Sequence, residues 1–266
     1  MTTGLRETLT PLPVAVGRSR LLVPRGLGGD EAHGPRRTSV RREAATLAIT
    51  LEQPGPCPPG GVTVFIVLDE SASVAASGGN DPLSQRHAET ALAIRHVANT
   101  CRCRADRVGL VPFDHASPGF VAPQPLSTAG VRRLTRGLER LSNGLGMSSE
   151  LEPPLRFVET EAGHQRASVA LVVFSDFLIT DANPSRVITR LRTFPGYLHA
   201  VVLGALPPSV LEADPNVAVT RLTPSSPPGD AARAVFDGLN YYRRHGHVAP
   251  GSAAHQGTNR RKEHSV

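Results

Sequence analysis

The sequence predicts an α/β protein with a doubly wound, mostly parallel β-sheet flanked by helices. Continuous runs of β-branched and other apolar residues recur along the middle of the chain, and such runs are typical of strands buried on both faces of a parallel sheet. Segments with helical spacing separate the runs, which implies right-handed crossovers. Polar residues follow two of the runs directly, where sheets of this kind bind ligands.

The predicted strands begin clearly at Val62–Leu68 (VTVFIVL), directly after the Pro- and Gly-rich stretch 53–61. In the next run, Arg107–Phe113, Pro112 cannot donate to a ladder, so we expect an edge strand or a bulge there. The remaining strand candidates are Ala45–Leu51, Phe120–Leu126, Ser168–Phe174, Tyr197–Leu203 and Val217–Leu222.

The predicted helices lie between these strands. Pro153 and Pro154 restrict one of them to a start near Glu150, because proline is tolerated in the first turn of a helix. In order, the helix candidates are Ser84–Cys101, Val131–Leu141, Glu150–Glu161, Ser185–Phe194 and Asp230–Arg243.

Composition divides the chain into three parts. Residues 1–60 form a Pro-, Gly- and Arg-rich N-terminal segment with short strand candidates, such as Leu21–Val23, and a linker at 26–42. Residues 61–243 form the α/β domain, and residues 244–266 are predicted to be a disordered basic tail.

The charge of the chain lies at its ends. Residues 1–46 carry eight arginines against four acidic residues, and residues 241–266 carry five basic residues against one, although the net charge is only +6. Charge alone supports non-specific, salt-sensitive contact with nucleic acid, and 4% aromatic residues without Trp provide few stacking platforms. Non-specific nucleic-acid binding by the ends therefore stays as an alternative function, and no specific nucleic-acid partner is predicted.

The sequence predicts a cytoplasmic protein without membrane association. No apolar run reaches the ~18 residues that a membrane span needs, and the N-terminus lacks a signal-peptide pattern. The three cysteines, Cys57, Cys101 and Cys103, cannot form a disulfide framework. The Cys101-x-Cys103 pair also lacks the second pair that a structural zinc site needs, so we interpret these cysteines as structural or incidental.

Oxygen-bearing side chains gather at the ends of two predicted strands. Asp69-Glu70-Ser71-Ala72-Ser73 follows the first strand, Ser175-Asp176 follows a later one, and a Gly-containing loop at 143–151 lies between them. Alternate residues point the same way, which places Asp69, Ser71 and Ser73 on one side of the turn. Such a set suits a hard cation such as Mg²⁺.

These motifs resemble the von Willebrand factor type A (VWA) domain with a metal-ion-dependent adhesion site (MIDAS). The family pattern is D-x-S-x-S after the first strand, a Thr in a Gly-rich loop before a helix, and an Asp after a later strand. The Arg107–Phe113 strand also resembles a family segment, and the resemblance covers roughly residues 60–243. The matching site residues are Asp69, Ser71, Ser73, Ser149 in place of the Thr, and Asp176.

The resemblance implies a function. Mg²⁺ or Mn²⁺ would be held by the D-x-S-x-S residues and, directly or through water, by Ser149 and Asp176. A partner protein would complete the coordination with an Asp or Glu carboxylate. Intracellular bacterial relatives often act as subunits of larger assemblies, which implies a subunit or adaptor role and no catalysis.

The sequence departs from the family pattern at several positions. Met147 and Ser148 stand where Gly-Gly is usual, Phe177 follows Asp176 where Gly is common, and Glu70 adds a carboxylate beside the first turn. These departures bear on the affinity of the site for its ion.

A phosphatase-like hydrolase is the alternative enzymatic interpretation, because an Asp at a strand end also occurs in haloacid-dehalogenase-type phosphatases. That chemistry needs a second Asp two residues later as general acid, and Ser71 stands there. The only lysine is Lys262, in the tail, and no G-x-S-x-G motif is present. We therefore predict that the protein is not an enzyme.

Other polar residues receive structural interpretations. Asp114 and His115 are expected in a surface turn, with support of the metal site as the alternative, and Asp181 in a loop or helix start. Four arginines are interpreted as a solvated helix face, with an acidic-partner patch as the alternative: Arg132, Arg133, Arg136 and Arg140. The histidines without zinc-site spacing are His87, His96, His164 and His199.

Overall fold

The computed structural model describes residues 49–75, 85–101, 103–114, 116–142, 146–165 and 168–246. The predicted strand at Leu21–Val23, the linker at 26–42 and most of the predicted tail lie outside the described residues. Of the strand expected at Ala45–Leu51 only residues 49–51 are described, and these are not in a strand.

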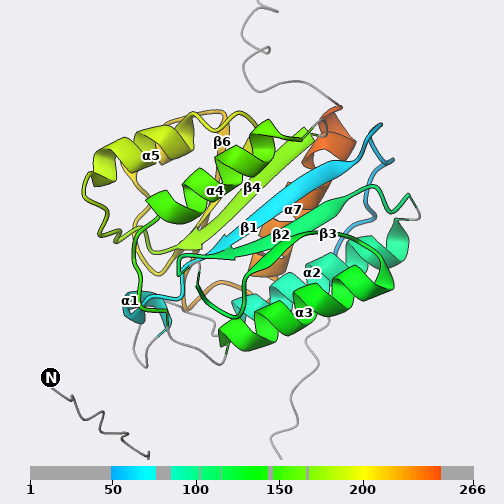
Figure 1. The fold of residues 1–266 in the computed structure, drawn as a ribbon, viewed down its shortest axis with the longest axis horizontal. Coiled ribbons are helices and arrows are strands. Elements are labelled where there is room, and N and C mark those ends of the chain that lie inside the picture. Colours follow the sequence, from blue (N-terminus) through cyan, green and yellow to red (C-terminus); the bar gives the residue numbers. More distant parts are fainter. Residues whose placement is uncertain are drawn as a thin grey trace, which may run out of the picture. The chain divides into compact units, whose positions relative to one another are not determined.

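The described residues build a six-stranded sheet in the order β3-β2-β1-β4-β5-β6 (Figure 1). Only the β2–β3 pair is antiparallel, and every other neighbouring pair is parallel. The strands are β1 (Val62–Leu68), β2 (Arg107–Pro112), β3 (Val121–Pro125), β4 (Ser168–Ser175), β5 (Tyr197–Leu203) and β6 (Val217–Leu222). The predicted fold class, a mostly parallel sheet flanked by helices, is confirmed.

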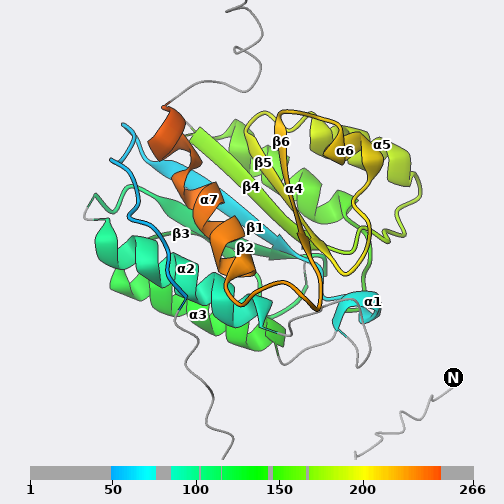
Figure 2. The ribbon, with the colours of Figure 1, turned by 180° about the vertical axis from the view of Figure 1, so that it is seen from behind.

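Helices cover both faces of this sheet (Figures 1 and 2). The helices are α1 (Ala72–Ala75), α2 (Arg86–Thr100), α3 (Thr128–Ser142), α4 (Glu152–Gly163), α5 (Pro184–Arg192), α6 (Ser209–Glu212) and α7 (Asp230–His245). One apolar core joins α2, α3 and α7 to the sheet, and a second joins α4, α5 and α6 to the opposite face. The four-residue helices α1 and α6 were not predicted, because they are too short to show a helical period.

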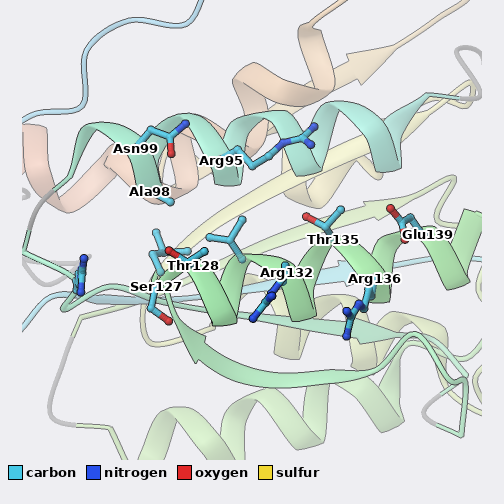
Figure 3. Close-up of a pocket in the computed structure, with 12 residues that line it drawn as sticks. Arg95, Ala98, Asn99, Ser127, Thr128, Arg132, Thr135, Arg136 and Glu139 are labelled. Carbon is cyan, nitrogen blue, oxygen red and sulfur yellow. The ribbon is translucent and has the colours of Figure 1, made fainter.

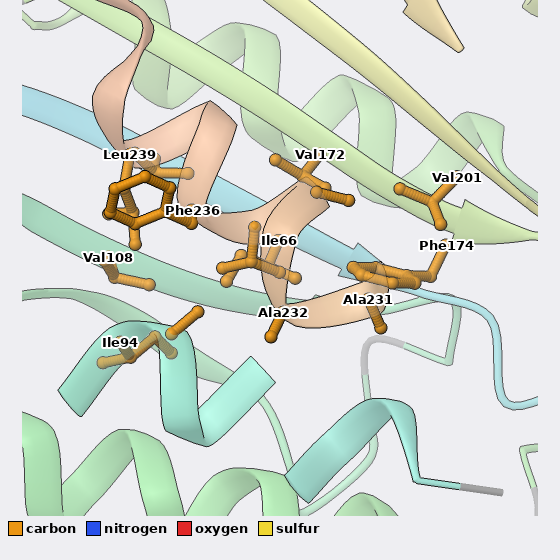
Figure 4. Close-up of a cluster of buried hydrophobic side chains, with 14 of the residues drawn as sticks. Ile66, Ile94, Val108, Val172, Phe174, Val201, Ala231, Ala232, Phe236 and Leu239 are labelled. Carbon is orange, nitrogen blue, oxygen red and sulfur yellow. The ribbon is translucent and has the colours of Figure 1, made fainter. Parts of the chain in front are cut away.

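Successive side chains of the central strands point alternately into the two cores. Ile66 of β1 and Val172 of β4 contribute to the core beneath α7, where Figure 4 shows them with Phe236 and Leu239. Phe65, next along β1, belongs to the core beneath α4 and α5. Because both faces are buried, the strand has no polar face, which explains its continuous apolar run.

Of the two alternatives expected at Arg107–Phe113, an edge strand or a bulge, the edge strand is wrong, since β2 lies between β1 and β3. A bulge does occur, between Val108 and Leu110 in the pairing with β3. Pro112 is the last residue of the strand, opposite Leu68. Its missing N–H therefore affects only the end of the ladder.

Parallel strands collect loops at two edges of the sheet. The carboxyl edge holds the turn after β1, the loop before α4 and the loop after β4; the amino edge holds residues 57–61, residues 101–106 and the end of α7. Residues 49–61 pack against α2 and α7 (Figure 2): Ile49 and Leu51 contact the core, and the Gly55 N–H donates to Asn240 Oδ1 at 2.9 Å. None of the helices in the described residues is long and apolar enough to cross a membrane.

Candidate metal centre

Asp69 lies at the centre of the carboxyl edge. Its N–H donates to the carbonyl of Phe174 at 2.9 Å, which continues the pairing of β1 with β4 by one residue. Its side chain is buried, with Oδ1 accepting from the Ser71 N–H at 2.9 Å and Oδ2 from the Ser175 hydroxyl at 2.7 Å. Both carboxylate oxygens are thus positioned by neutral donors from two different strand ends.

The two serines of the turn after β1 point toward each other. Their Oγ atoms are 3.0 Å apart; Ser71 is buried and Ser73 is half-buried. The two hydroxyls therefore lie together, as predicted, but Ser73 already belongs to α1, so strand alternation is not what brings them together.

Asp176 follows β4 and is also buried. Its Oδ1 accepts from the Leu178 N–H at 2.9 Å, and Ser175 Oγ accepts from the Phe177 N–H at 2.8 Å. Phe177 has φ of +58°, in the left-handed region that glycine adopts most easily. This explains why the resemblance leads one to expect Gly here; in this chain the Phe177 ring is buried in the core beneath α4 and α5.

Burial raises the pKa of Asp69 above its ordinary value. Hydrogen bonds from Ser175 and Ser71 oppose this rise, and the negative charge of Asp176 adds to it. The two carboxylates are therefore close enough to repel each other. A cation placed with them would relieve that repulsion.

Glu70, the extra carboxylate of this turn, is occupied by α2. Its Oε2 pairs with Arg86 at 3.0 Å and its Oε1 with His87 at 2.7 Å, while Arg86 also donates to the Asp69 carbonyl at 3.0 Å. All of these side chains are buried. Glu70 thus fixes the turn to the helix, a role that complementary charges at the start of the predicted helix could have suggested.

The loop before α4 is bonded to both neighbouring strand ends. The Gly146 N–H donates to the Glu70 carbonyl at 2.7 Å, and the Ser149 carbonyl accepts from the Thr180 N–H at 3.1 Å. A Cβ on Gly146 would lie 3.0 Å from the Glu70 carbonyl oxygen, so this approach favours glycine. The half-buried Ser149 is thus held between the turn after β1 and the loop after β4.

Asp181 has a role that the sequence did not reveal. It lies in a loop, as expected, but it is buried and its carboxylate accepts from the Leu151 N–H at 2.9 Å and the Glu152 N–H at 2.8 Å. It therefore caps α4 from a distant segment, because Leu151 at the N-cap has no side-chain acceptor. The sequence signal for such a cap is a helix that starts near Pro153–Pro154 with no capping residue before it.

The other candidates stay outside this cluster. Asp114 accepts from the Ala116 N–H at 3.1 Å and forms a turn; His115 lies outside the described residues. His96 contacts the Glu52 carbonyl and His199 contacts Thr220. The arginines of α3 predicted to be solvated are exposed.

A separate cleft of about 490 Å³ lies along α2 and α3 (Figure 3). Its lining includes one acidic residue, Glu139, and four arginines: Arg95, Arg104, Arg132 and Arg136. None of the five predicted metal ligands lines it. The cleft is therefore distinct from the carboxyl-edge cluster.

No protein-family model matches the chain, and no curated protein matches it. Solved structures of similar fold include manganese-loaded TRAP of Plasmodium vivax, with 10% identity, TM-score 0.45, and 69% of this chain and 75% of that one covered. The VWA domain of SpRpn10 has 14% identity, TM-score 0.43, and coverage of 65% and 93%.

A third similar structure comprises three N-terminal domains of the pilus tip protein Mfa5 of Porphyromonas gingivalis. It has 20% identity and TM-score 0.35, and the match covers 45% of this chain and 20% of that one. The chain thus spans a fifth of the Mfa5 structure. It is similar in fold to VWA domains, as the sequence resemblance predicts.

Proposed function

We propose that this chain is a protein-interaction module that binds Mg²⁺ or Mn²⁺ at the carboxyl edge of its sheet. The observation that carries the proposal is the meeting of two buried carboxylates, Asp69 and Asp176, with two hydroxyls whose oxygens are 3.0 Å apart. The proposed ligands, bound directly or through water, are Asp69, Ser71, Ser73, Ser149 and Asp176.

The donor set fits a hard divalent cation. It consists only of oxygen atoms, which Mg²⁺ and Mn²⁺ prefer. The nearby guanidinium of Arg86 is directed to the Asp69 carbonyl and to Glu70, while the Asp69 carboxylate accepts from neutral donors. Two carboxylates balance the charge of one divalent ion, and an ion that keeps exchangeable positions can accept a further carboxylate from a partner.

The surroundings of the cluster favour a protein partner. Met147, on the loop that carries Ser149, is 92% exposed, and Leu178, two residues after Asp176, is 58% exposed. Exposed apolar side chains beside polar ligands are suited to a docking surface. We infer that an acidic side chain of the partner reaches the ion while apolar partner residues cover Met147 and Leu178.

Isothermal titration of the full chain with Mg²⁺ and with Mn²⁺ tests the ion site. We expect saturable binding that is lost in Asp69→Asn and weakened in Ser71→Ala. Asp114→Asn is the matched control, since Asp114 also follows a strand at this edge but forms only a turn. Absence of heat and of a thermal shift up to millimolar ion would overturn the proposal, as would full binding by Asp69→Asn.

Capture of a partner from a native bacterial lysate, with and without EDTA, tests the proposed protein interaction. We propose a role as a subunit or adaptor of a cytoplasmic assembly, so binding should require the ion and should weaken in Asp176→Ala. A partner that binds equally well in EDTA uses another face, for which the arginine-lined cleft is the next candidate. A panel of phosphoesters should show only background turnover, because Ser71 stands where a general acid would be needed.

A further inference from the structure

Three cysteines meet at the amino edge, although they come from two separate segments. Cys57 lies five residues before β1, and Cys101 caps the end of α2, two residues before Cys103. The Cys101 sulfur is 2.8 Å from that of Cys57 and 2.9 Å from that of Cys103. Cys101 is therefore in contact with two thiols at once, at the edge opposite the candidate metal centre.

A guanidinium faces the same sulfurs. Arg243, in the last turn of α7, donates through Nη2 to Cys101 Sγ at 3.1 Å and through Nη1 to Cys57 Sγ at 3.6 Å. It is held by a buried ion pair with Asp106 and donates to the Gly55 carbonyl at 2.9 Å. The positive charge is thus fixed against the cluster.

This arrangement favours an ionised Cys101. Although burial raises the pKa of its thiol, hydrogen bonds from Arg243, Cys103 and Cys57 outweigh that effect and lower the pKa to about 7. Burial and contacts with the other thiols raise the pKa of Cys57 to about 12. Cys101 then carries the negative charge, while Cys57 stays a protonated donor.

We propose that Cys101 is the peroxide-reactive thiolate of this cluster and that it closes an intramolecular disulfide with one of the two thiols that contact it. The thiolate attacks a hydroperoxide and the O–O bond breaks, so that one oxygen passes to Cys101 as a sulfenic acid. The remaining alkoxide or hydroxide takes a proton from solvent and leaves as an alcohol or water. The neighbouring sulfur then attacks Cys101 and releases water. Two thiols lose two electrons in total, and the hydroperoxide is the oxidant.

Arg243 supports the second step as well as the first. Once Cys101 is oxidised it no longer carries a charge, and the guanidinium remains beside Cys57 to stabilise its thiolate. The exposed Cys103 offers the alternative partner and an approach for reducing thiols. A bridge to Cys57 would tie residues 49–61 to the end of α2.

The geometry favours thiol chemistry over a metal site. Among the described residues, no His, Asp or Glu joins the three cysteines as a fourth ligand. The guanidinium also occupies the cluster, where a cation would have to bind.

The test uses the full reduced chain, treated with hydrogen peroxide at pH 7, alkylated, and mapped by non-reducing peptide mass spectrometry. We expect loss of two thiols per chain and a bridge from Cys101 to Cys57 or Cys103. Cys101→Ser should keep its remaining thiols, whereas Cys57→Ser and Cys103→Ser should each still form a bridge through Cys101. An intact Cys101, or a bridge only between chains through Cys103, overturns the proposal.

The role of Arg243 is tested by measuring the rate at which Cys101 is oxidised. Arg243→Gln should slow the oxidation of Cys101 by roughly tenfold, because less thiolate is present at pH 7. Since that variant leaves Asp106 buried without its partner and can fail to fold, the pH dependence of Cys101 alkylation in the unaltered chain is measured too. Half-maximal reactivity near pH 7 supports the proposal; reactivity equal to that of a free cysteine overturns it. Stoichiometric zinc in freshly purified chain, lost in Cys101→Ser, also overturns it.

Discussion

The two edges of this sheet hold opposite kinds of chemistry. The carboxyl edge gathers carboxylates and hydroxyls around Asp69, while the amino edge gathers three thiols around the buried Arg243–Asp106 pair. At the carboxyl edge the buried negative charges face each other; at the amino edge a buried positive charge is already matched. In our proposal a bound cation offsets the negative charge of the first edge, whereas at the second edge Asp106 of the chain itself already matches the Arg243 charge.

The largest expected loss of stability comes from removing Asp106, the partner of the buried Arg243 at the amino edge. Asp106→Ala leaves the Arg243 charge buried and removes the acceptor of the Val62 N–H at the start of β1. Removing one partner of a buried pair costs about 3 kcal/mol or more of unfolding free energy. Denaturant unfolding should show this loss, while Arg156→Ala, which breaks an exposed pair with Glu152, should cost less than about 1 kcal/mol. Similar costs for the two variants would contradict the contrast between the edges.

The next largest effect on stability comes from protonation of His199, which lies in the sheet between the two edges. Burial lowers the pKa of His199 on β5 to about 4, from about 6.5 when exposed. Below pH 6.5 the unfolded chain takes up a proton at this position, while the folded chain does so only near pH 4. The unfolding free energy should therefore fall across this window, by up to about 3 kcal/mol.

Unfolding of the unaltered chain and of His199→Phe, measured between pH 7 and pH 4, checks this prediction. The variant cannot titrate at that position, so its stability should depend less on pH. Equal pH dependence in the two proteins would place the acid sensitivity elsewhere, for example at one of the two edges.

The contrast between the edges also explains what could be predicted from sequence. The strands of the sheet and the residues after β1 and β4 lie in short continuous segments. Their sequence patterns can be recognised without knowing the fold. The cysteine cluster does not lie in one continuous segment, because Cys57 and Cys101 are 44 residues apart. They meet only because α2 runs back along the sheet and ends at the edge where β1 and β2 begin. From the sequence we interpreted them as structural or incidental, because three cysteines form no disulfide framework and Cys101-x-Cys103 lacks a second pair. The cap of α4 by Asp181 was missed because its acceptor lies 29 and 30 residues away from its donors.

A smaller effect tests how the carboxyl edge is assembled. Asp181→Ala removes the cap of α4 and should cost about 1–2 kcal/mol of stability. Because the same segment positions Ser149, cation affinity should fall several-fold as well. Asn183→Ala is the matched control: it removes the cap of α5, where Asn183 accepts from the Arg186 N–H at 3.0 Å, and should lower stability by about 1 kcal/mol while leaving cation affinity unchanged. Equal cation affinity in Asp181→Ala and Asn183→Ala would separate the α4 loop from the ion site.

The smallest expected change in stability belongs to Asp69→Asn, although Asp69 is buried at the centre of the carboxyl edge. Its raised pKa means that the folded environment disfavours its charge at neutral pH. The amide still accepts from the Ser71 N–H and removes the repulsion from Asp176. Without divalent ions the unfolding free energy should therefore stay the same or rise, in contrast to Asp106→Ala. With saturating Mg²⁺ the order should reverse, because only the unaltered chain gains stability from a bound ion. Denaturant unfolding of both proteins, in EDTA and in Mg²⁺, measures the two halves of this prediction separately. A large loss of stability for Asp69→Asn in EDTA would show that the carboxyl edge, like the amino edge, is balanced by the chain itself.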